Sequence, residues 1–472
     1  MMSKILSLVN DFMYSYLLII ILIVGGLYFT LRSGLVQFRL FGEQIRVVGE
    51  KPSRSEESGK KKVSSFQALM VSTASRVGTG NIIGVSTALC LGGFGSVFWM
   101  WVIAIIGAAT AFAESTLAQI YKKKAPDGTS YGGPAQYIEG GLRLRSLAVI
   151  FSVLLVVTYG FGFNMLASYN LQSTFSTYEF YDPSWTPWLI GGIIALAVGY
   201  CLFGGGSRVL RVTGVLVPIM GVAYVLVSLV IVAMNITSLP SVFGRIFSEA
   251  FDFKAIFGGF GGSCVMYGIK RGLFSNEAGV GSAPNAAAAA EVSHPVKQGL
   301  VQALSVFIDT VVICSATAFM CLCSGIEPAA DLQGAPYVQK ALGNTLGDFG
   351  PAFITVSMIL FAFTTLLGNL YYVNQAFSHI MKRVPTKKFM YCYYVVASLI
   401  IFVGAGLSAD MLWSIADITM GMMAIINMPV IVILSGQVFR TLKNYVKQKK
   451  AGKNPEFKAA DISLPHETDF WN

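Results

Sequence analysis

Apolar residues in this chain gather in blocks separated by short polar segments. A block of about 20 apolar residues is long enough to cross the hydrocarbon core of a membrane as one α-helix. Eleven blocks of this kind lie near residues 12–31, 64–92, 95–120, 146–172, 186–204, 207–236, 252–273, 296–325, 348–381, 388–407 and 409–438. The pattern therefore predicts an all-α integral membrane protein with about eleven transmembrane helices, surrounded by membrane lipid.

The charged residues support this class and indicate an orientation. Only 12% of the residues are charged, about half the usual share in a soluble protein. Of the 34 lysines and arginines, all but Lys4, Arg76, Arg245, Lys254 and Lys340 fall in the loops after odd-numbered blocks, with the adjoining block ends included, or in the C-terminal tail. Because cytoplasmic loops carry the excess of basic residues, we expect a cell-membrane protein with its N-terminus outside and its C-terminus in the cytoplasm. The net charge of +10 then reports topology and not nucleic-acid binding.

Two of the blocks are interrupted by glycine-rich runs. The second block contains Arg76-Val-Gly-Thr-Gly-Asn81, and the seventh contains Phe257-Gly-Gly-Phe-Gly-Gly-Ser263. In lipid, every backbone N–H and C=O needs an internal partner, so irregular backbone survives only where it lines an enclosed cavity. The spacing Gly78-x-Gly80 does not fit a helix-packing groove, and such a groove does not need its polar neighbours. The sequence therefore predicts two broken helices.

The positions of the two breaks indicate an internal symmetry. With the first block set aside, the breaks fall in the first helix of each of two sets of five. Because five is an odd number, the second set enters the membrane from the opposite side and forms an inverted repeat. We expect one extra N-terminal helix and a basic cytoplasmic loop over residues 1–63, five-helix repeats over 64–236 and 252–438, and a flexible basic cytoplasmic tail over 439–472.

A break in a helix has the chemistry of an amino-acid site. A half-helix that begins at Gly80 presents free N–H groups and a positive dipole end, which suit a carboxylate. A half-helix that ends near Val77 presents free carbonyls, which suit a cation or an ammonium group. Broken helices at matching positions of two repeats are typical of transporters. The substrate-binding residues predicted from the first break are Gly78, Thr79, Gly80 and Asn81.

Several motifs also give the chain a specific resemblance. They are Arg76-Val-Gly-Thr-Gly-Asn-Ile-Ile-Gly84, Phe98-Trp-Met-Trp101, Tyr131-Gly-Gly-Pro134, Lys270-Arg-Gly-Leu-Phe-Ser-Asn-Glu-Ala-Gly279 with Gly281-Ser-Ala, and Phe361-Ala-Phe-Thr-Thr365. From about residue 66 to residue 437, the chain resembles the alanine/glycine:cation symporter family, the sodium:alanine symporters. This resemblance implies a leucine-transporter-type fold and the secondary-active uptake of a small neutral amino acid with sodium, by alternating access.

The same resemblance implies positions for both solutes. The amino group of the substrate should meet carbonyls around Gly259 and Gly261, with Phe260 closing the pocket. Sodium is a hard cation that binds several oxygen atoms. An alternative for a threonine in a membrane helix is a hydrogen bond to the carbonyl one turn earlier. The implied sodium ligands are the carbonyls of Ala74, Val77 and Phe361 and the hydroxyls of Thr364 and Thr365.

Two positions depart from the family pattern and bear on the substrate. Ala167 stands where the family usually has a glutamine that faces the substrate, and Asn369 stands where it usually has a tryptophan. Both changes leave a smaller side chain beside the expected pocket, and Asn369 adds a hydrogen-bonding amide. We therefore expect an amino acid larger or more polar than alanine or glycine, such as serine, asparagine or glutamine.

Ionisable residues inside the blocks are candidates for gating or coupling. Arg76 is expected beside the first break, where it either neutralises helix carbonyls or forms a gate with Glu114 or Glu277. A proton-coupled transporter would instead use a carboxylate such as Asp309 or Asp417, and a sensor would bind an amino acid without moving it. The three histidines have no metal-ligand spacing, and no filter motif is present, so neither an enzyme nor a channel is expected.

Overall fold

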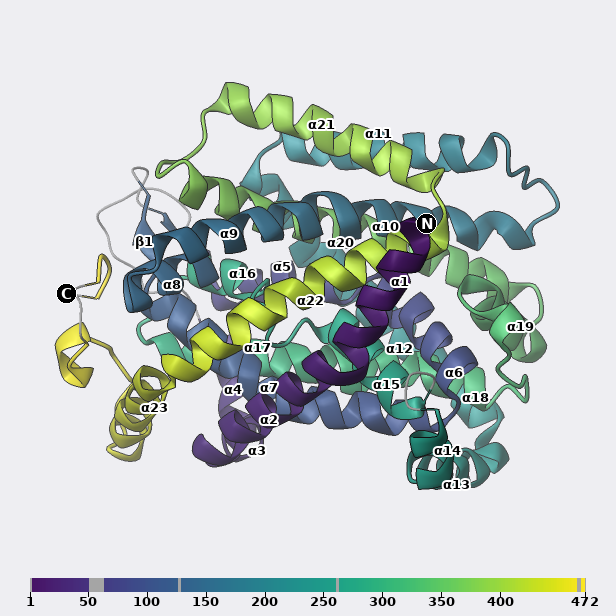
Figure 1. Cartoon of the computed structure of the whole chain (residues 1–472), viewed down its shortest axis with the longest axis horizontal. Helices are drawn as coiled ribbons and strands as arrows, with labels where there is room; N and C mark the ends of the chain where they lie inside the picture. The colour runs from purple at the N-terminus through teal and green to yellow at the C-terminus, as the bar shows by residue number, and fades with distance from the viewer. Residues whose placement is uncertain (1, 51–62, 126–128, 260–262, 465–467, 472) are drawn as a thin grey trace.

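Most of the long helices run roughly along one axis in the computed structural model, which describes residues 2–50, 63–125, 129–259, 263–464 and 468–471 (Figure 1). Helix α23 (Ser435–Lys450) lies at one end of this axis and helix α14 (Phe253–Gly258) at the other. We refer to these as the α23 end and the α14 end. A helix satisfies its own backbone groups, which is why long apolar runs take this form in lipid.

Nine helices in the described part of the chain are long and apolar enough to cross a membrane. Each coincides with a predicted block, so the all-α membrane architecture is confirmed. They are Leu8–Arg32 (α1, α2), Gly95–Ile120 (α7), Arg145–Thr177 (α9, α10), Thr186–Phe203 (α11), Gly206–Met234 (α12), Pro295–Leu322 (α17, α18), Phe349–Ile380 (α20), Lys387–Ala405 (α21) and Ala409–Ile433 (α22).

Three of these spans are composite, because a π-helical segment separates two α-helical pieces. The α-helical pieces are α1 (Met2–Phe12), α2 (Leu18–Arg32), α9 (Arg145–Leu155), α10 (Phe163–Ser173), α17 (Pro295–Val306) and α18 (Ser315–Leu322). The π-helical segments are η1 (Met13–Leu17), η3 (Val156–Gly162) and η7 (Phe307–Cys314). The remaining connections are α3 (Val36–Arg39), α4 (Phe41–Val48), the antiparallel strands β1 (Lys123–Lys124) and β2 (Ser130–Tyr131), α8 (Pro134–Leu142), α13 (Leu239–Ala250) and α19 (Ala335–Leu346).

The second predicted block forms a broken helix at the expected place. Helix α5 (Ser65–Arg76) begins with a reciprocal cap between Ser64 and Gln67 and ends at Arg76. The next residue, Val77, leaves the helical region with φ −75° and ψ 84°. The chain then resumes as η2 (Gly80–Gly84) and α6 (Val85–Gly92).

The other broken helix lies later in the chain than the sequence predicted. Helices α15 (Cys264–Asn276) and α16 (Pro284–Ala289) flank an irregular segment over residues 277–283. Glu277, Gly279 and Gly281 have φ angles of 54°, 86° and 90°, a region that no α-helix can continue through. The interruption of this block therefore falls inside the Asn-Glu-Ala-Gly motif and not before it.

The described residues of the predicted glycine run occupy a different position. Gly258 is the last residue of α14, and Gly258 and Gly259 are both exposed at the α14 end. A Cβ built on Gly259 would have no heavy atom within 4 Å, so this glycine has no close packing to serve. Phe260 and Gly261 lie outside the described residues. The structure therefore does not bring Gly259 together with the first break.

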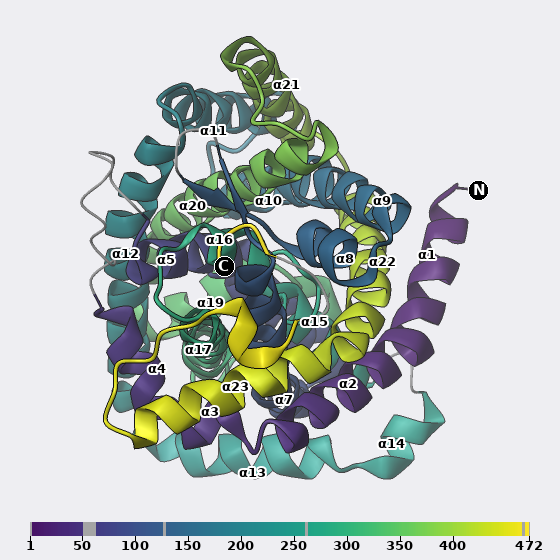
Figure 2. The same ribbon diagram turned by 90° about the vertical axis from the view of Figure 1, so that its left-hand side faces the viewer.

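Helix α7 lies in the interior and packs against α2, α15 and α17. The two broken helices contact each other through α5 and α16, which lie close together near the middle of the view along the axis (Figure 2). Helices α11 and α21 pack on each other and form an outer layer at the top of both views. The broken helices are therefore enclosed by other helices, as irregular backbone in lipid requires.

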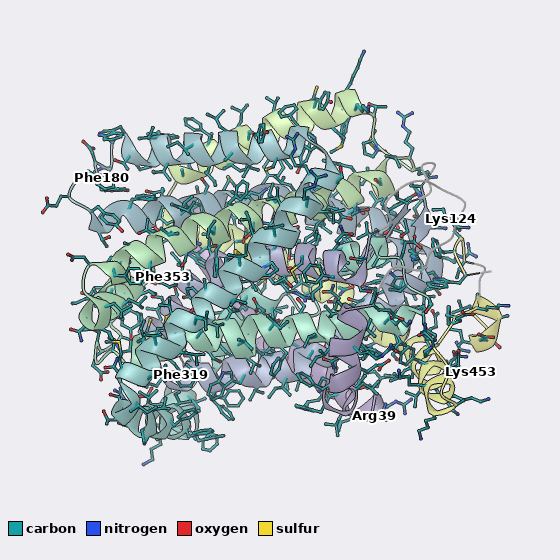
Figure 3. All side chains as sticks on the ribbon, turned by 180° about the vertical axis from the view of Figure 1, so that it is seen from behind. Arg39, Lys124, Phe180, Phe319, Phe353 and Lys453 are labelled. Atoms are coloured by element: carbon teal, nitrogen blue, oxygen red, sulfur yellow. The ribbon has the colours of Figure 1, made fainter. Side chains whose placement is uncertain are left out.

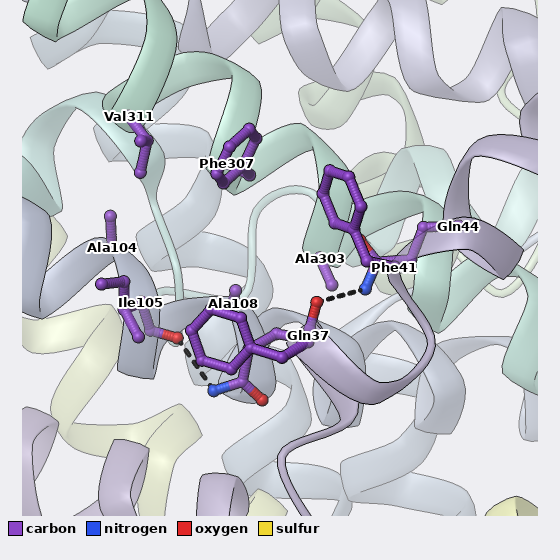
Figure 4. Close-up of a pocket in the computed structure, with 10 residues that line it drawn as sticks. Gln37, Phe41, Gln44, Ala104, Ile105, Ala108, Ala303, Phe307 and Val311 are labelled. Atoms are coloured by element: carbon purple, nitrogen blue, oxygen red, sulfur yellow. Dashed lines mark hydrogen bonds between the residues drawn. The ribbon is translucent and has the colours of Figure 1, made fainter.

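The N-terminal segment after α2 covers one side of this interior. Gln37 of α3 donates to the carbonyl of Ile105 at 3.2 Å, and Gln44 of α4 donates to the carbonyl of Gln37 at 3.0 Å. Between this segment, α7 and α17 lies an apolar cavity of about 280 Å³, edged by Phe41 and Phe307 (Figure 4). The side-chain amide of Gln37 therefore attaches the N-terminal segment to α7.

The C-terminal tail is more ordered than its polar sequence suggests. Trp471 is buried and donates its indole N–H to the carbonyl of Gln119 at 2.7 Å. Phe457 packs on Trp471 with ring centroids 5.4 Å apart, and its backbone N–H donates to Ser293 at 3.0 Å. The described tail thus packs on the ends of α7 and α16, whereas the sequence predicted a flexible segment.

Basic residues mark one end of the molecule. Figure 3 shows Arg39, Lys124 and Lys453 at one end, and Phe180 and Phe319 at the other. This arrangement agrees with a cytoplasmic α23 end, although the orientation and the count of eleven crossings stay predictions.

Two charges were assigned to the wrong surroundings from sequence. Lys270 and Arg271, at the end of the seventh predicted block, were counted with the basic loop that follows it, yet both lie buried in α15. The reason is the position of the break, because α15 continues to Asn276 and carries both residues into the interior.

Candidate functional site

The first break is held open by one side chain. The N–H of Gly78 donates to Oδ1 of Asn81 at 2.8 Å, whereas a continuous helix would direct it to the carbonyl of Ala74. The carbonyls of Ala74 and Val77 are therefore released from the helical pattern beside a buried turn. This is the free-carbonyl end that the sequence predicted.

Asn81 is itself fixed from a second helix. Its Nδ2 donates to the carboxylate of Asp309 at 2.8 Å, and its carbonyl accepts from the hydroxyl of Thr317 at 2.7 Å. The side-chain oxygen and nitrogen of Asn81 are both used inside the protein. Of the four residues predicted from the first break, Asn81 thus braces the turn, while Thr79 and Gly80 contribute N–H groups at the start of the next half-helix.

The second break lies beside the first. Ring atoms of Phe274, in the last turn of α15, would lie 2.9 Å from a Cβ on Gly80, so only glycine permits this approach. Asn276 caps the irregular segment by accepting from the N–H of Ala278 at 3.0 Å. The end of α15 therefore lies beside the start of η2. The position of this second break was not predicted from the sequence, although Gly279-x-Gly281 and Pro284 are signals of an interrupted helix.

The two candidate threonine ligands of α20 differ in their surroundings. Thr364 bonds back one turn, donating to the carbonyl of Leu360 at 3.0 Å or of Phe361 at 3.2 Å. Thr365 is buried, and its hydroxyl has no hydrogen-bond partner among the described residues. A Cβ built on Gly78 would lie 1.9 Å from that hydroxyl oxygen. Thr365 therefore faces the first break, whereas Thr364 satisfies its own helix.

This oxygen set suits a sodium ion. Hard cations bind neutral oxygen atoms of the kind found here. They are the released carbonyls of Ala74 and Val77, the carbonyl of Phe361 and the hydroxyl of Thr365, which has no partner among the described residues. An orphaned buried hydroxyl costs about 1–3 kcal/mol, which an ion at this place would recover. The described residues contain no cluster of three or more His, Cys, Asp or Glu side chains that could hold a metal ion.

A polar wall lies next to this set. Asn369 of α20 accepts from the hydroxyl of Ser75 at 2.7 Å and donates to Oδ1 of Asn164 in α10 at 3.0 Å. Ala167 lies one turn after Asn164 and is buried. Asn170, one turn further, donates to the hydroxyl of Thr79 at 3.2 Å. Helix α10 and helix α20 thus bring both unusual positions, Ala167 and Asn369, to the first break.

The three gate candidates are buried together but are not directly paired. Arg76 donates to Oε1 of Gln302 at 3.2 Å, and no ion pair joins it to Glu114 or Glu277 in the described chain. Two of its nitrogens, Nε and Nη2, have no hydrogen-bond partner among the described residues. Arg76 directly follows Ser75, whose hydroxyl lies 3.2 Å from the carboxylate of Glu277. A gate formed by this arginine stays a prediction.

The two glutamates hold the second break in place. Glu277 accepts from Ser282 at 2.6 Å, and its carboxylate lies 3.2 Å from the hydroxyl of Ser75 as an alternative acceptor to Asn369. Glu114 of α7 accepts from Asn427 at 2.9 Å and from the N–H of Gly279 at 3.4 Å. Because Ser75 belongs to α5 and Ser282 follows Glu277, one carboxylate joins both broken helices.

A buried ion cluster that the sequence did not predict lies further along α15. Asp417 of α22 contacts both Lys270 and Arg271 at 3.0 Å, and Asn10 of the N-terminal helix accepts from Lys270 at 3.1 Å. The guanidinium of Arg271 stacks on Trp413 at 4.2 Å. Breaking such a buried pair costs several kcal/mol, so these contacts fix α15 against α22. The sequence placed Asp417 inside a span as a candidate for proton coupling, and its two basic partners were not predicted.

Comparison with known proteins identifies the class. The sodium:alanine symporter family model matches residues 1–459. The chain belongs to this family. Amino-acid carrier protein AlsT of Bacillus subtilis (strain 168) is 41% identical, over 99% of this chain and 97% of that protein. The probable sodium/glutamine symporter GlnT of the same strain is 42% identical, over 97% of this chain and 93% of that protein.

More distant comparisons agree with this assignment. Sodium/alanine symporter AgcS of Methanococcus maripaludis is 36% identical, over 95% of this chain and 98% of that protein. The crystal structure of MhsT in complex with L-phenylalanine matches with a TM-score of 0.58 at 13% identity, over 80% of this chain and 90% of that chain. At this identity the likeness shows the fold alone, and it confirms the leucine-transporter type. The protein is a multi-pass amino-acid:cation symporter and not an enzyme.

Proposed function

We propose that this protein takes up a small neutral amino acid together with sodium by alternating access, as a secondary-active symporter in the cell membrane. The observation that carries the proposal is the buried hydroxyl of Thr365, which has no hydrogen-bond partner among the described residues and faces Gly78 in the first break. A neutral oxygen set with no carboxylate in it suits a monovalent cation.

The geometry supports binding of the substrate carboxylate at the first break and of its ammonium group at the second. The substrate carboxylate meets the N–H groups of Thr79 and Gly80, because the N–H of Gly78 already serves Asn81. The substrate ammonium meets the last carbonyls of α15, around Phe274 to Asn276, where the helix dipole is negative. This replaces the face expected from Gly259 to Gly261.

Coupling follows from the shared position of the two solutes. Sodium at the carbonyls of α5 and a carboxylate at the start of η2 lie on opposite sides of one short turn. The cation lowers the cost of placing the carboxylate there, and the carboxylate does the same for the cation. By linkage each solute raises the affinity of the site for the other.

Uptake into proteoliposomes tests this proposal. With an inward sodium gradient we expect accumulation of labelled alanine or glutamine, and with choline in its place we expect none. A pH gradient applied without sodium should give no accumulation. Accumulation driven by protons alone would favour the proton-coupled alternative, and sodium-dependent binding without uptake would favour a sensor.

Asn369 supports a substrate with a polar side chain. Its amide has one hydrogen bond to Ser75 and one to Asn164, so one N–H remains available. A relative 42% identical over nearly the whole chain is named a probable sodium/glutamine symporter. We propose that this N–H lies at the side-chain end of the substrate and favours an amide or hydroxyl there.

Replacing Asn369 with alanine should reduce the preference for glutamine over alanine. We expect the ratio of kcat/KM for glutamine to that for alanine to fall about tenfold, the effect of losing one hydrogen bond to a buried polar group. A ratio is used because it does not depend on the amount of folded protein. Asn374→Ala on the same helix serves as the control and should leave the ratio unchanged.

A further inference from the structure

The span formed by α17 and α18 changes its winding beside the two breaks. Its middle is the π-helical segment η7, and Asp309 lies in this segment with its side chain fully buried. A π-helical turn inserts an extra residue and rotates the side chains near it, and such turns occur frequently at functional sites. Asp309 has no role in the proposed contacts with either solute.

The carboxylate of Asp309 is bonded to both broken helices. Its Oδ1 accepts from Asn81 at 2.8 Å, and its Oδ2 accepts from the hydroxyl of Ser275 at 2.8 Å. Asn81 belongs to the first break, and Ser275 belongs to the last turn of α15 before the second. Thr310 also donates to Oδ2 at 2.8 Å, which fixes the rotamer from within η7.

A chain of hydrogen bonds leads from this carboxylate to the candidate sodium ligands. Asp309 accepts from Nδ2 of Asn81, so the opposite face of the amide, Oδ1, is turned to the N–H of Gly78. That bond removes the N–H of Gly78 from the carbonyl of Ala74. The Ala74 carbonyl thereby loses this helical partner, and the hydroxyl of Thr365 faces the same turn at Gly78. A charged acceptor makes the first bond of this chain roughly twice as strong as a neutral one would.

We propose that Asp309 is a positioning residue for sodium, one that sets the orientation of the Ala74 carbonyl through Asn81 and Gly78. It does not touch the ion. The inference rests on the proposed sodium-coupled function. A buried carboxylate that positions a sodium ligand can be distinguished from one that carries a proton. Substituting the first changes the affinity for sodium, whereas substituting the second changes the dependence of transport on pH.

Asp309→Asn tests the inference, because it keeps the size of the side chain and removes one of its two acceptors. We expect the sodium concentration for half-maximal uptake to rise at least about tenfold, as losses of groups that orient metal ligands do. The pH profile of uptake at saturating sodium should stay that of the unmodified protein. Asp348→Asn, an exposed carboxylate at the start of α20, is the control.

Sodium binding is measured separately from transport, by the rise in thermal unfolding temperature of the purified protein in sodium against choline. The same shift in half-maximal sodium is expected there. Asn81→Ala should also raise the half-maximal sodium concentration. The double variant Asp309→Asn with Asn81→Ala should raise it no further than Asn81→Ala alone, because both residues act through the same series of hydrogen bonds. Additive increases in the double variant would show that the two residues act independently and would overturn the proposal.

Two results would overturn the proposal outright: unchanged sodium dependence in Asp309→Asn, or a lost pH dependence in place of a lost sodium affinity. The proposed function fails in a different way. If the unmodified protein is stabilised by sodium but does not accumulate amino acid, symport is wrong while the role of Asp309 in sodium binding still stands or falls by its own shift.

Discussion

Replacing Thr365 with valine is expected to raise the sodium concentration for half-maximal uptake by about 10- to 100-fold, because losing one partner of a charged group costs about 1.5–3 kcal/mol. Valine keeps the shape of threonine and removes only the hydroxyl. That hydroxyl is buried, lacks a partner among the described residues, and faces Gly78. Uptake of alanine into proteoliposomes over a sodium series, with total salt held constant by choline, measures the effect.

The neighbouring residue provides the matched control. Thr364→Val makes the same chemical change one position earlier, where the hydroxyl bonds to carbonyls of its own helix. Such a bond contributes little to a membrane helix, so half-maximal sodium should change by less than about threefold. Equal effects at the two positions would show that the hydroxyl of Thr365 is not special. A larger effect at Thr364 would move the cation to the other side of α20.

The sequence could not separate these two threonines. Adjacent residues on a helix point about 100° apart, so only one of them faces a given neighbour. Which one depends on the rotation of α20 relative to α5, and that rotation is set by packing. At Gly368 the close approach is visible, because a Cβ there would meet the backbone of Ser75 at 2.7 Å. Both threonines could be predicted from the sequence as candidate sodium ligands. Only the packed structure shows which of the two faces the first break.

The two breaks show a similar limit. The first was predictable because Gly78-x-Gly80 has polar neighbours, which a packing groove does not need. For the second, the dense glycine run before α15 outweighed Gly279-x-Gly281. The structure shows that the number of glycines is a weaker signal than their conformation, because the helix ends at Glu277, a residue with a side chain, in the left-handed region.

Charge was informative about topology and less so about contacts. Basic residues near the ends of spans, such as Lys124 and Lys453, lie at the same end of the molecule, which agrees with the loop pattern (Figure 3). Arg76 was expected either to neutralise helix carbonyls or to form a gate with a glutamate, and the hydrogen bond it makes to the side chain of Gln302 was not predicted. A loop pattern depends only on the sequence order of the spans, whereas a partner depends on distances of a few ångströms between helices far apart in the chain.

Replacing Gly78 with alanine is expected to abolish sodium-driven uptake, with a loss of at least about 100-fold, because the new Cβ falls where the hydroxyl of Thr365 now lies. The distance would be 1.9 Å to that oxygen and 3.1 Å to the Cβ of Thr365, so one of the two helices has to move. Such a shift removes the oxygen set and the coupling together. Uptake and sodium-dependent thermal stabilisation are both measured.

Gly84→Ala is the control for glycine in the same broken helix, since a Cβ there would meet its nearest neighbour, a carbon of Arg271, at 3.9 Å. It should retain sodium-driven uptake. The double variant Gly78→Ala with Thr365→Ala separates packing from ligation, because it removes the clashing oxygen and leaves a contact near 3.1 Å. We expect it to regain much of the lost thermal stability without regaining the response to sodium. Recovery of sodium-driven uptake in the double variant would mean that the hydroxyl of Thr365 obstructs alanine at this position but does not bind the ion.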